Sequence, residues 1–304
     1  MPSSRRPLTF KGPWQTIKTA AVNCCEAPIT GAQKFYRLIS PAVGKKWLRV
    51  AAVTMNAKTN VEANLQAMHT YMDQALTNGA DLVVFPEVAL QQCPPWGNIS
   101  HTPTSQEMAY VRQTAETVPG PSTSNLVAKA SEVKLYVVFG LTEKGDAGQL
   151  YNTSVLLGPQ GVLGKHRKYH LWDDTYGGNE AEIWQLGTNA PAVVESPLGK
   201  VGLLICIEQA LGEDTRLANA GADFLVSGSL WFTGQEGSWD QYTKGDAIET
   251  KRWYVATDQV GPVGHLITIG RSRVVDPLGR IVCDTGAKEG LVVCSMDLII
   301  DANR

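Results

Sequence analysis

Beyond its first 47 residues the sequence alternates short apolar runs with longer amphipathic segments, and this alternation is the strongest constraint on its fold. Leu48–Thr54 is apolar and β-branched, as a buried strand is. Thr59 and Asn60 can then cap a helix whose apolar residues recur at three- and four-residue steps, and Asn78-Gly79 ends it. Leu82–Phe85 is a second apolar run, typical of a strand buried on both faces. A strand, a helix and a strand in this order indicate an α/β fold.

Further strand-length and helix-length segments follow along the chain, and those near the end are close enough together to form hairpins. The pattern therefore favours a mixed sheet over a purely parallel one. The additional strands are predicted at 135–141, 154–157, 201–205, 224–227, 254–256, 266–269, 273–275 and 291–293. The additional helices are predicted at 123–131, 215–220 and 241–251.

The first 47 residues differ from the rest, because they are rich in Pro, Lys, Arg and Ser and have only a broken apolar pattern. We therefore predict an N-terminal extension, residues 1–47, followed by one domain, residues 48–304. Arg5 and Arg6 are not followed by the apolar stretch that a secretory signal requires. This favours a cytoplasmic protein.

Composition narrows the range of partners. The net charge of -2 gives no general attraction to nucleic acid or to an anionic membrane surface. No apolar run approaches the roughly 20 residues that a membrane-spanning helix needs. The 6 cysteines are scattered and none forms a Cys-x-x-Cys pair, so we expect reduced thiols, no metal site and no cofactor.

Two chemically active side chains follow apolar strands directly. Glu87 comes after the run at 82–85 and Cys206 after the run at 201–205. Because the carboxyl ends of buried strands line a crevice, both side chains are expected at a site. Taken singly, Glu87 is equally well explained as a surface carboxylate and Cys206 as a small core residue.

The third candidate is Lys168, which lies in the basic stretch Gly164–Leu171, a composition that by itself indicates a solvated loop. A cysteine that attacks an amide or nitrile needs a base to take its proton. It also needs a cation or N–H donors to stabilise the negative charge that develops on the substrate. Glu87, Lys168 and Cys206 are the residue types that supply these functions.

In order and approximate spacing, these segments resemble the motifs of the nitrilase (carbon–nitrogen hydrolase) superfamily. The three main matching segments are Phe85-Pro86-Glu87, Arg167-Lys168-Tyr169-His170-Leu171 and Ile205-Cys206-Ile207-Glu208. Supporting similarities are Tyr151-Asn152-Thr153, Ala222-Asp223, Gly270-Arg271-Ser272 and Asp276-Pro277-Leu278-Gly279. The resemblance covers about residues 47–300 and implies a four-layer αββα sandwich with mixed sheets. It also implies a hydrolase that releases ammonia or an amine from a small amide or N-carbamoyl compound.

The resemblance implies a role for each central residue. Glu87 takes the proton of Cys206, and the thiolate attacks the substrate carbon to form an acyl-enzyme. Lys168 and the backbone N–H of Ile207 stabilise the developing negative charge, and Glu87 then activates the water that releases the acid.

A second glutamate lies close to the lysine in this family. Glu180 fits its usual position, four residues before Trp184 and seven before Gly187. Glu182 is the alternative, because some amidases of the family have a tighter spacing. Either carboxylate could instead lie on the surface beside a loop.

Two further expectations concern contacts. Trp172 and Trp231 either line a substrate pocket or pack in the core. Members of the family usually pair through helices that flank the cysteine strand, which implies at least a homodimer. Here the pairing helix would be Leu211–Ala220, with Leu211, Leu217 and Ala218 in contact.

Three functions remain open from the sequence. Amide or carbamoyl hydrolysis is favoured, because most branches of the family cleave such bonds. Nitrile hydrolysis is less favoured, because Ile207 stands where true nitrilases have tryptophan. A non-catalytic binding protein of the same fold is the third, and the presence of all three central residues argues against it.

Overall fold

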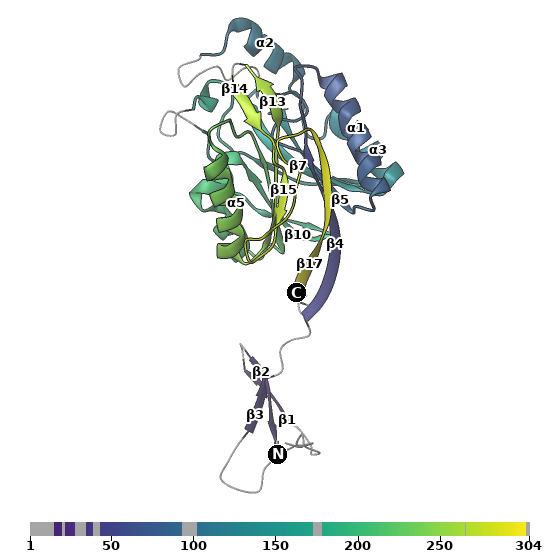
Figure 1. Ribbon diagram of the computed structural model, residues 1–304, viewed down its shortest axis with the longest axis vertical. Coiled ribbons are helices and arrows are strands. Elements are labelled where there is room, and N and C mark those ends of the chain that lie inside the picture. Colours follow the sequence, from purple (N-terminus) through teal and green to yellow (C-terminus); the bar gives the residue numbers. More distant parts are fainter. Residues whose placement is uncertain are drawn as a thin grey trace, which may run out of the picture. The chain divides into compact units, whose positions relative to one another are not determined.

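The computed structural model describes residues 15–19, 22–27, 35–38, 43–92, 102–172, 178–264 and 266–301 (Figure 1). The chain divides into two compact units, residues 1–46 with 299–304 and residues 47–298. Strands β1 (Gln15–Thr19), β2 (Val22–Ala27) and β3 (Phe35–Leu38) of the first unit pair as an antiparallel sheet. These strands were not predicted from the sequence, because their apolar pattern is too broken. The division into an extension, 1–47, and a hydrolase domain, 48–304, remains a prediction.

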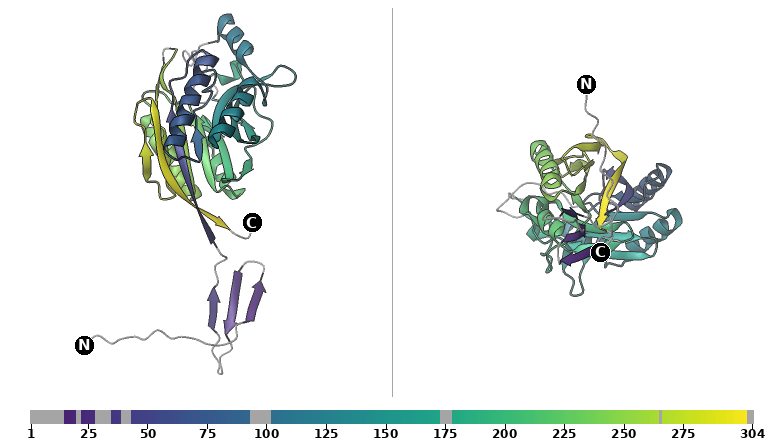
Figure 2. Two further views of the ribbon diagram at one scale, coloured as in Figure 1. Left: turned by 90° about the vertical axis from the view of Figure 1, so that its right-hand side faces the viewer. Right: turned by 90° about the horizontal axis from the view of Figure 1, so that it is seen from below.

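The first sheet of the larger unit has six strands in the order β17-β4-β5-β6-β7-β8. Their bounds are β4 (Val43–Thr54), β5 (Leu82–Val84), β6 (Tyr136–Lys144), β7 (Leu150–Gly158), β8 (Gly161–Arg167) and β17 (Gly290–Asp301). β4, β5 and β6 are parallel, whereas β7 and β8 pair antiparallel as successive hairpin strands. The last strand, β17, lies beside β4 (Figure 2).

The second sheet also has six strands, in the order β16-β15-β12-β11-β10-β9. Their bounds are β9 (Val193–Ser196), β10 (Gly199–Ile205), β11 (Phe224–Ser229), β12 (Trp253–Asp258), β15 (Arg273–Val275) and β16 (Ile281–Asp284). β10, β11 and β12 are parallel and the remaining pairs are antiparallel. A separate hairpin consists of β13 (Val260–Val263) and β14 (Leu266–Ile269). The prediction of mixed sheets is confirmed.

Helices cover the outer faces of the two sheets, which gives the expected four-layer αββα sandwich (Figure 1). Apolar side chains of α1 (Val61–Thr77) and α3 (Pro121–Val133) share a core cluster with strands of the first sheet. Those of α4 (Glu213–Asn219) and α5 (Glu236–Thr250) share one with the second. Within the described ranges, no helix is long and apolar enough to cross a membrane.

One predicted helix has the expected ends, whereas one strand was taken for a loop and one helix was not predicted. Of the two predicted caps, Thr59 and Asn60, it is Asn60 that caps α1, by accepting the N–H of Ala63 at 3.0 Å, and Asn78 ends the helix as predicted. The basic stretch taken for a loop begins as strand β8. Helix α2 (Ser105–Thr114), which a capping box at Thr104 starts, was missed because its residues are mainly polar.

Two side-chain expectations were wrong. Leu217, expected at a dimer contact, is 0% exposed within the chain's own core, because α4 turns this residue toward the second sheet. Cys283 of β16 and Cys294 of β17 form a disulfide, although reduced thiols were expected. The two strands are edge strands of different sheets, and linear spacing does not reveal that these edges meet.

Candidate active site

Glu87 lies just beyond β5, where the chain leaves the first sheet. Its Oε1 accepts hydrogen bonds from Lys168 Nζ at 2.8 Å and Asn152 Nδ2 at 2.7 Å. Its backbone carbonyl accepts one from Gln259 Nε2 at 2.8 Å. The other carboxyl oxygen, Oε2, is buried and has no hydrogen-bond partner in the part of the chain that the structure describes. One oxygen of Glu87 is therefore fixed and the other is available for chemistry.

Glycines from both sheets contact the backbone of Glu87. A β-carbon on Gly140 of β6 would collide with the backbone nitrogen of Val88. A β-carbon on Gly228 of β11 would lie 2.9 Å from the backbone nitrogen of Glu87. Only glycine permits this close approach at either position, so the two sheets together hold the carboxylate in place.

Lys168 follows β8, and its backbone N–H donates to the carbonyl of Asn152 at 2.8 Å. Its side chain is 0% exposed and donates from Nζ to Glu180 Oε1 at 2.6 Å and to Glu87 Oε1 at 2.8 Å. Burial by itself lowers the pKa of Lys168, but the carboxyl groups of Glu180 and Glu87 outweigh burial and raise that pKa above its usual range. The lysine is therefore a fixed cation between two carboxyl groups.

Glu180 begins the short 3-10 helix η2 (Glu180–Glu182) and is buried. Besides Lys168, its carboxylate accepts the backbone N–H of Trp172 at 2.9 Å. Burial raises the pKa of Glu180 to about 7. The side chain of Glu182, the alternative second glutamate, is exposed. The structure thus places Glu180 and not Glu182 beside the lysine.

Cys206 begins the 3-10 helix η3 (Cys206–Leu211) at the carboxyl end of β10. Its φ of 50° lies in the left-handed region, which a residue with a β-carbon adopts at an energetic cost and which is frequent at functional sites. The thiol lies 3.9 Å from the carbonyl oxygen of Leu230. Burial and the nearby Glu87 raise the pKa of the Cys206 thiol well above its usual value. Both effects favour the neutral thiol over the thiolate. Ile207 lies in the first turn of η3, where N–H groups have no partner inside the helix.

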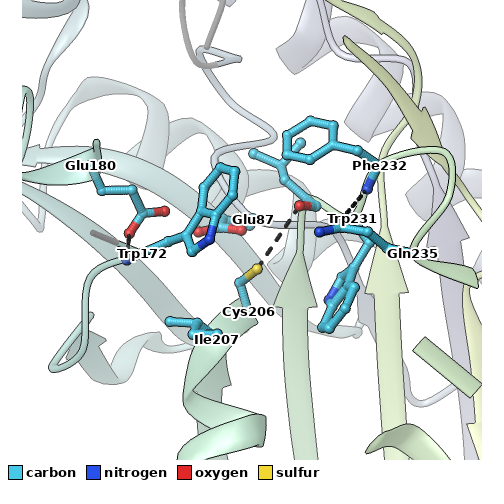
Figure 3. A pocket seen from close by; sticks show the side chains of 9 residues that line it. Glu87, Trp172, Glu180, Cys206, Ile207, Trp231, Phe232 and Gln235 are labelled. Atoms are coloured by element: carbon cyan, nitrogen blue, oxygen red, sulfur yellow. Dashed lines mark hydrogen bonds between the residues drawn. The ribbon is translucent and has the colours of Figure 1, made fainter. Parts of the chain in front are cut away.

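A cavity of about 50 Å³ opens beside these groups (Figure 3). Its described lining residues are Glu87, Trp172, Glu180, Cys206, Ile207, Leu230, Trp231, Phe232 and Gln235. The rings of Trp172 and Phe232 are 6.0 Å apart between centroids. Trp231 packs against Trp239 and Tyr242 at 6.0 and 5.9 Å between centroids. Both predicted tryptophans therefore line the pocket, and each also packs against other aromatic side chains.

Glu208 joins the cysteine segment to the lysine segment. It is 0% exposed and accepts the backbone N–H groups of Ile205 at 2.8 Å and Tyr169 at 2.6 Å. His166 Nε2 lies 2.9 Å from both of its oxygens. This one carboxylate thus fixes the end of β10 relative to Lys168.

Sequence reasoning missed some residues of this site. Asn152, which holds Glu87, was noted only as part of a supporting motif, although a polar side chain in an apolar strand is itself a signal. Phe232 and Gln235 lie just beyond β11, at the same carboxyl-end position that drew attention to Glu87 and Cys206. Applying that rule to every buried strand would have identified this loop.

Comparison with known proteins gives a consistent result. A family model described as carbon-nitrogen hydrolase matches residues 49–299. The omega-amidase NIT2 of Danio rerio is 30% identical over 82% of this chain and 88% of its own length. A probable nitrilase of Schizosaccharomyces pombe is 29% identical over the same shares.

Solved structures share the fold. Nit3 of Saccharomyces cerevisiae, a nitrilase-superfamily member, superimposes with a TM-score of 0.71 at 22% identity, covering 83% of this chain and 90% of its own. An amidase from Nesterenkonia superimposes with a TM-score of 0.69 at 22% identity, covering 84% and 91%. A mutant of that amidase, with a TM-score of 0.69 at 20% identity over 82% and 90%, carries the acetamide moiety of fluoroacetamide covalently at its active site cysteine.

Proposed function

The chain belongs to the carbon–nitrogen hydrolase family of the nitrilase superfamily, and on that premise we propose that it hydrolyses a small amide or N-carbamoyl compound through an acyl-enzyme on Cys206. The observation that carries this proposal is the unpartnered Oε2 of Glu87. Lys168 and Asn152 occupy the other oxygen of that carboxylate, so Oε2 is the atom left to accept the thiol proton.

The first half-reaction forms the acyl-enzyme. The Cys206 proton moves to Glu87 as the sulfur bonds to the carbonyl carbon, and the carbonyl electron pair moves to oxygen. Lys168 Nζ and the Ile207 N–H stabilise this oxyanion. As the carbonyl re-forms, the carbon–nitrogen bond breaks, and Glu87 returns the proton to the leaving nitrogen. Ammonia or an amine departs and a thioester remains.

The second half-reaction restores the enzyme. Glu87 takes a proton from water as the water oxygen attacks the thioester carbon, and the same donors stabilise the second oxyanion. The carbon–sulfur bond then breaks, and the proton held by Glu87 returns to sulfur. Glu180 holds Lys168 and the backbone of Trp172 in position through both steps.

Amide hydrolysis is favoured over nitrile hydrolysis by two observations on relatives. Omega-amidases match 82% of this chain at up to 30% identity. An amidase of the same fold holds an acetamide moiety on its cysteine.

The test is ammonia release from a panel of short amides, N-carbamoyl compounds and nitriles, with intact-mass measurement of the acyl-enzyme. Cys206→Ala should abolish release and the mass increase while leaving the melting temperature close to that of the parent. Cys24→Ala, the same change in the smaller unit, is the matched control. Undiminished ammonia release by Cys206→Ala would contradict the mechanism, and release from nitriles alone would replace the amide assignment.

We also propose that the protein is at least a homodimer, as its family resemblance implies. Leu217 is buried in its own chain, so it cannot contact a second copy. Leu211 and Ala218, which are half-buried, would supply the apolar contacts between the subunits. Light scattering at micromolar concentration tests this, and a mass equal to the 32.9 kDa monomer would contradict it.

A further inference from the structure

The charge around the cavity is unsuited to an anion. Glu87 and Glu180 both line it, and Lys168, the cation next to them among the described residues, donates to both. None of the described residues that line the cavity is a lysine or an arginine. Lys168 therefore has no unshared positive charge for a carboxylate on the acyl chain of a substrate.

The rest of the wall is apolar and encloses little space. Trp172, Leu230, Phe232 and Ile207 supply aromatic and aliphatic surface. The cavity of about 50 Å³ has room for on the order of four water-sized groups. A short acyl chain fits this space, whereas a carboxylate would lose its hydration there without gaining an ionic partner. Such desolvation is strongly unfavourable for an ion that gains no partner.

Gln235 is the carboxamide side chain among the described residues of this wall, which also includes the indole N–H groups of Trp172 and Trp231. Its Oε1 accepts the backbone N–H of Phe232 at 2.8 Å, which fixes the orientation of the amide. Its Nε2 donates to no other described residue. An oriented N–H donor on an apolar wall suits a neutral oxygen acceptor, such as a ketone or hydroxyl group on the acyl chain.

We propose that this pocket selects short, uncharged amides and rejects amides whose acyl chain ends in a carboxylate, and that Gln235 sets this preference. The proposal rests on the amide hydrolysis proposed above and specifies its substrate class.

The experiment compares two amides of nearly equal size, levulinamide, which ends in a methyl ketone, and succinamate, which ends in a carboxylate. The ratio of kcat/KM is measured by ammonia release with the whole protein. Binding of both compounds to the Cys206→Ala protein is measured separately by ligand-observed NMR titration. We expect levulinamide to be preferred by at least about 100-fold in kcat/KM, since a buried carboxylate without an ionic partner loses its hydration without compensation.

Three variants of Gln235 identify the residue responsible. Gln235→Arg supplies a cation and should reduce the preference for levulinamide by at least about tenfold, because it pairs with the carboxylate. Gln235→Glu keeps an oxygen for the Phe232 N–H but replaces the donor with an anion, so it should weaken the use of both amides and increase the discrimination against succinamate. Gln235→Met removes the donor and should lower the ratio of kcat/KM for levulinamide to kcat/KM for butyramide, because butyramide has no acceptor for that donor.

The two readouts separate the possible failures. Absence of ammonia release from every amide, with levulinamide still bound preferentially by Cys206→Ala, would refute the proposed reaction but support the neutral preference. Release from succinamate at a rate equal to or above that from levulinamide would overturn the preference while leaving the reaction intact. Failure of both compounds to bind, or a ratio that Gln235→Arg does not change, would also overturn the inference.

Discussion

Glu208 offers a sharp test of how the site is positioned, because its fully buried carboxylate joins the segments that carry Cys206 and Lys168. Glu208→Gln keeps the shape of the side chain but leaves it one acceptor oxygen instead of two. The backbone N–H of either Ile205 or Tyr169 must then face an amide NH₂ group. We therefore expect the variant to fold, with the thiol and the lysine displaced relative to each other.

The expected losses of activity and stability in Glu208→Gln follow from that lost hydrogen bond. A buried N–H without a partner costs about 1–3 kcal/mol. If most of this cost reflects displacement of groups that act in the transition state, kcat/KM falls by about 10–100-fold, because each tenfold corresponds to about 1.4 kcal/mol. The melting temperature should fall by about 2–4 °C for each kcal/mol lost.

The matched control is Glu143→Gln. Glu143 is 1% exposed and accepts hydrogen bonds from Thr153, Lys165 and Arg167, but it does not line the cavity. The Glu143→Gln control should lower the melting temperature by about as much as Glu208→Gln does. Its kcat/KM should stay within about threefold of that of the parent protein. Both variants are assayed by ammonia release and thermal unfolding. Equal losses of stability with unchanged kcat/KM in Glu208→Gln would show that Glu208 is merely structural.

Four further predictions follow from the site and its surroundings. Lys168→Ala should lower kcat by a factor on the order of 100 or more, and a defect confined to KM would assign the lysine to substrate binding instead. Glu87→Gln should give little acyl-enzyme by mass spectrometry, whereas Glu180→Gln should retain some, and the opposite order would exchange their roles. Because burial raises the pKa of Glu180 to about 7, kcat/KM should increase as pH rises through that value, and Glu180→Gln should flatten this part of the profile. Burial and nearby Asp214 raise the pKa of Asp246 to about 8, so stability is lost as pH rises from about 4 to about 8, where only the folded state keeps that proton. Asp246→Asn should therefore raise the melting temperature by about 2–4 °C per kcal/mol recovered at alkaline pH and have little effect near pH 4, and equal shifts at both pH values would contradict this.

The part of the fold that follows from local signals could be predicted from the sequence. The cap at Asn60 and the apolar stripe after it define α1, and the apolar runs define most of the central strands. Strand β8 was misread because Lys165 and Arg167 suggest solvent. In the folded chain, however, both form ion pairs with Glu143 of β6, which lies two strands away in the same sheet. Pairing between charges in different strands is invisible in a linear pattern.

The candidate site also contains residues that local signals reveal and residues that only tertiary contacts reveal. Glu87 and Cys206 could be identified because each ends an apolar strand, and the resemblance to known motifs singled out Lys168 and Glu180. Asn152 and Glu208 depend on contacts between segments that are 65 and 39 residues apart. Their importance arises only from the packing of one segment on another.

The position of Glu87 between Gly140 and Gly228 has a consequence for how activity arises during folding. In the proposed mechanism, the base Glu87 and the cation Lys168 follow strands of the sheet built mainly from the first half of the chain, whereas the Cys206 thiol follows a strand of the sheet built from the second half. A chain with only one sheet formed holds either a base without a nucleophile or a nucleophile without a base. In the proposed mechanism, the Cys206 thiol would therefore have its base only once the two sheets have docked.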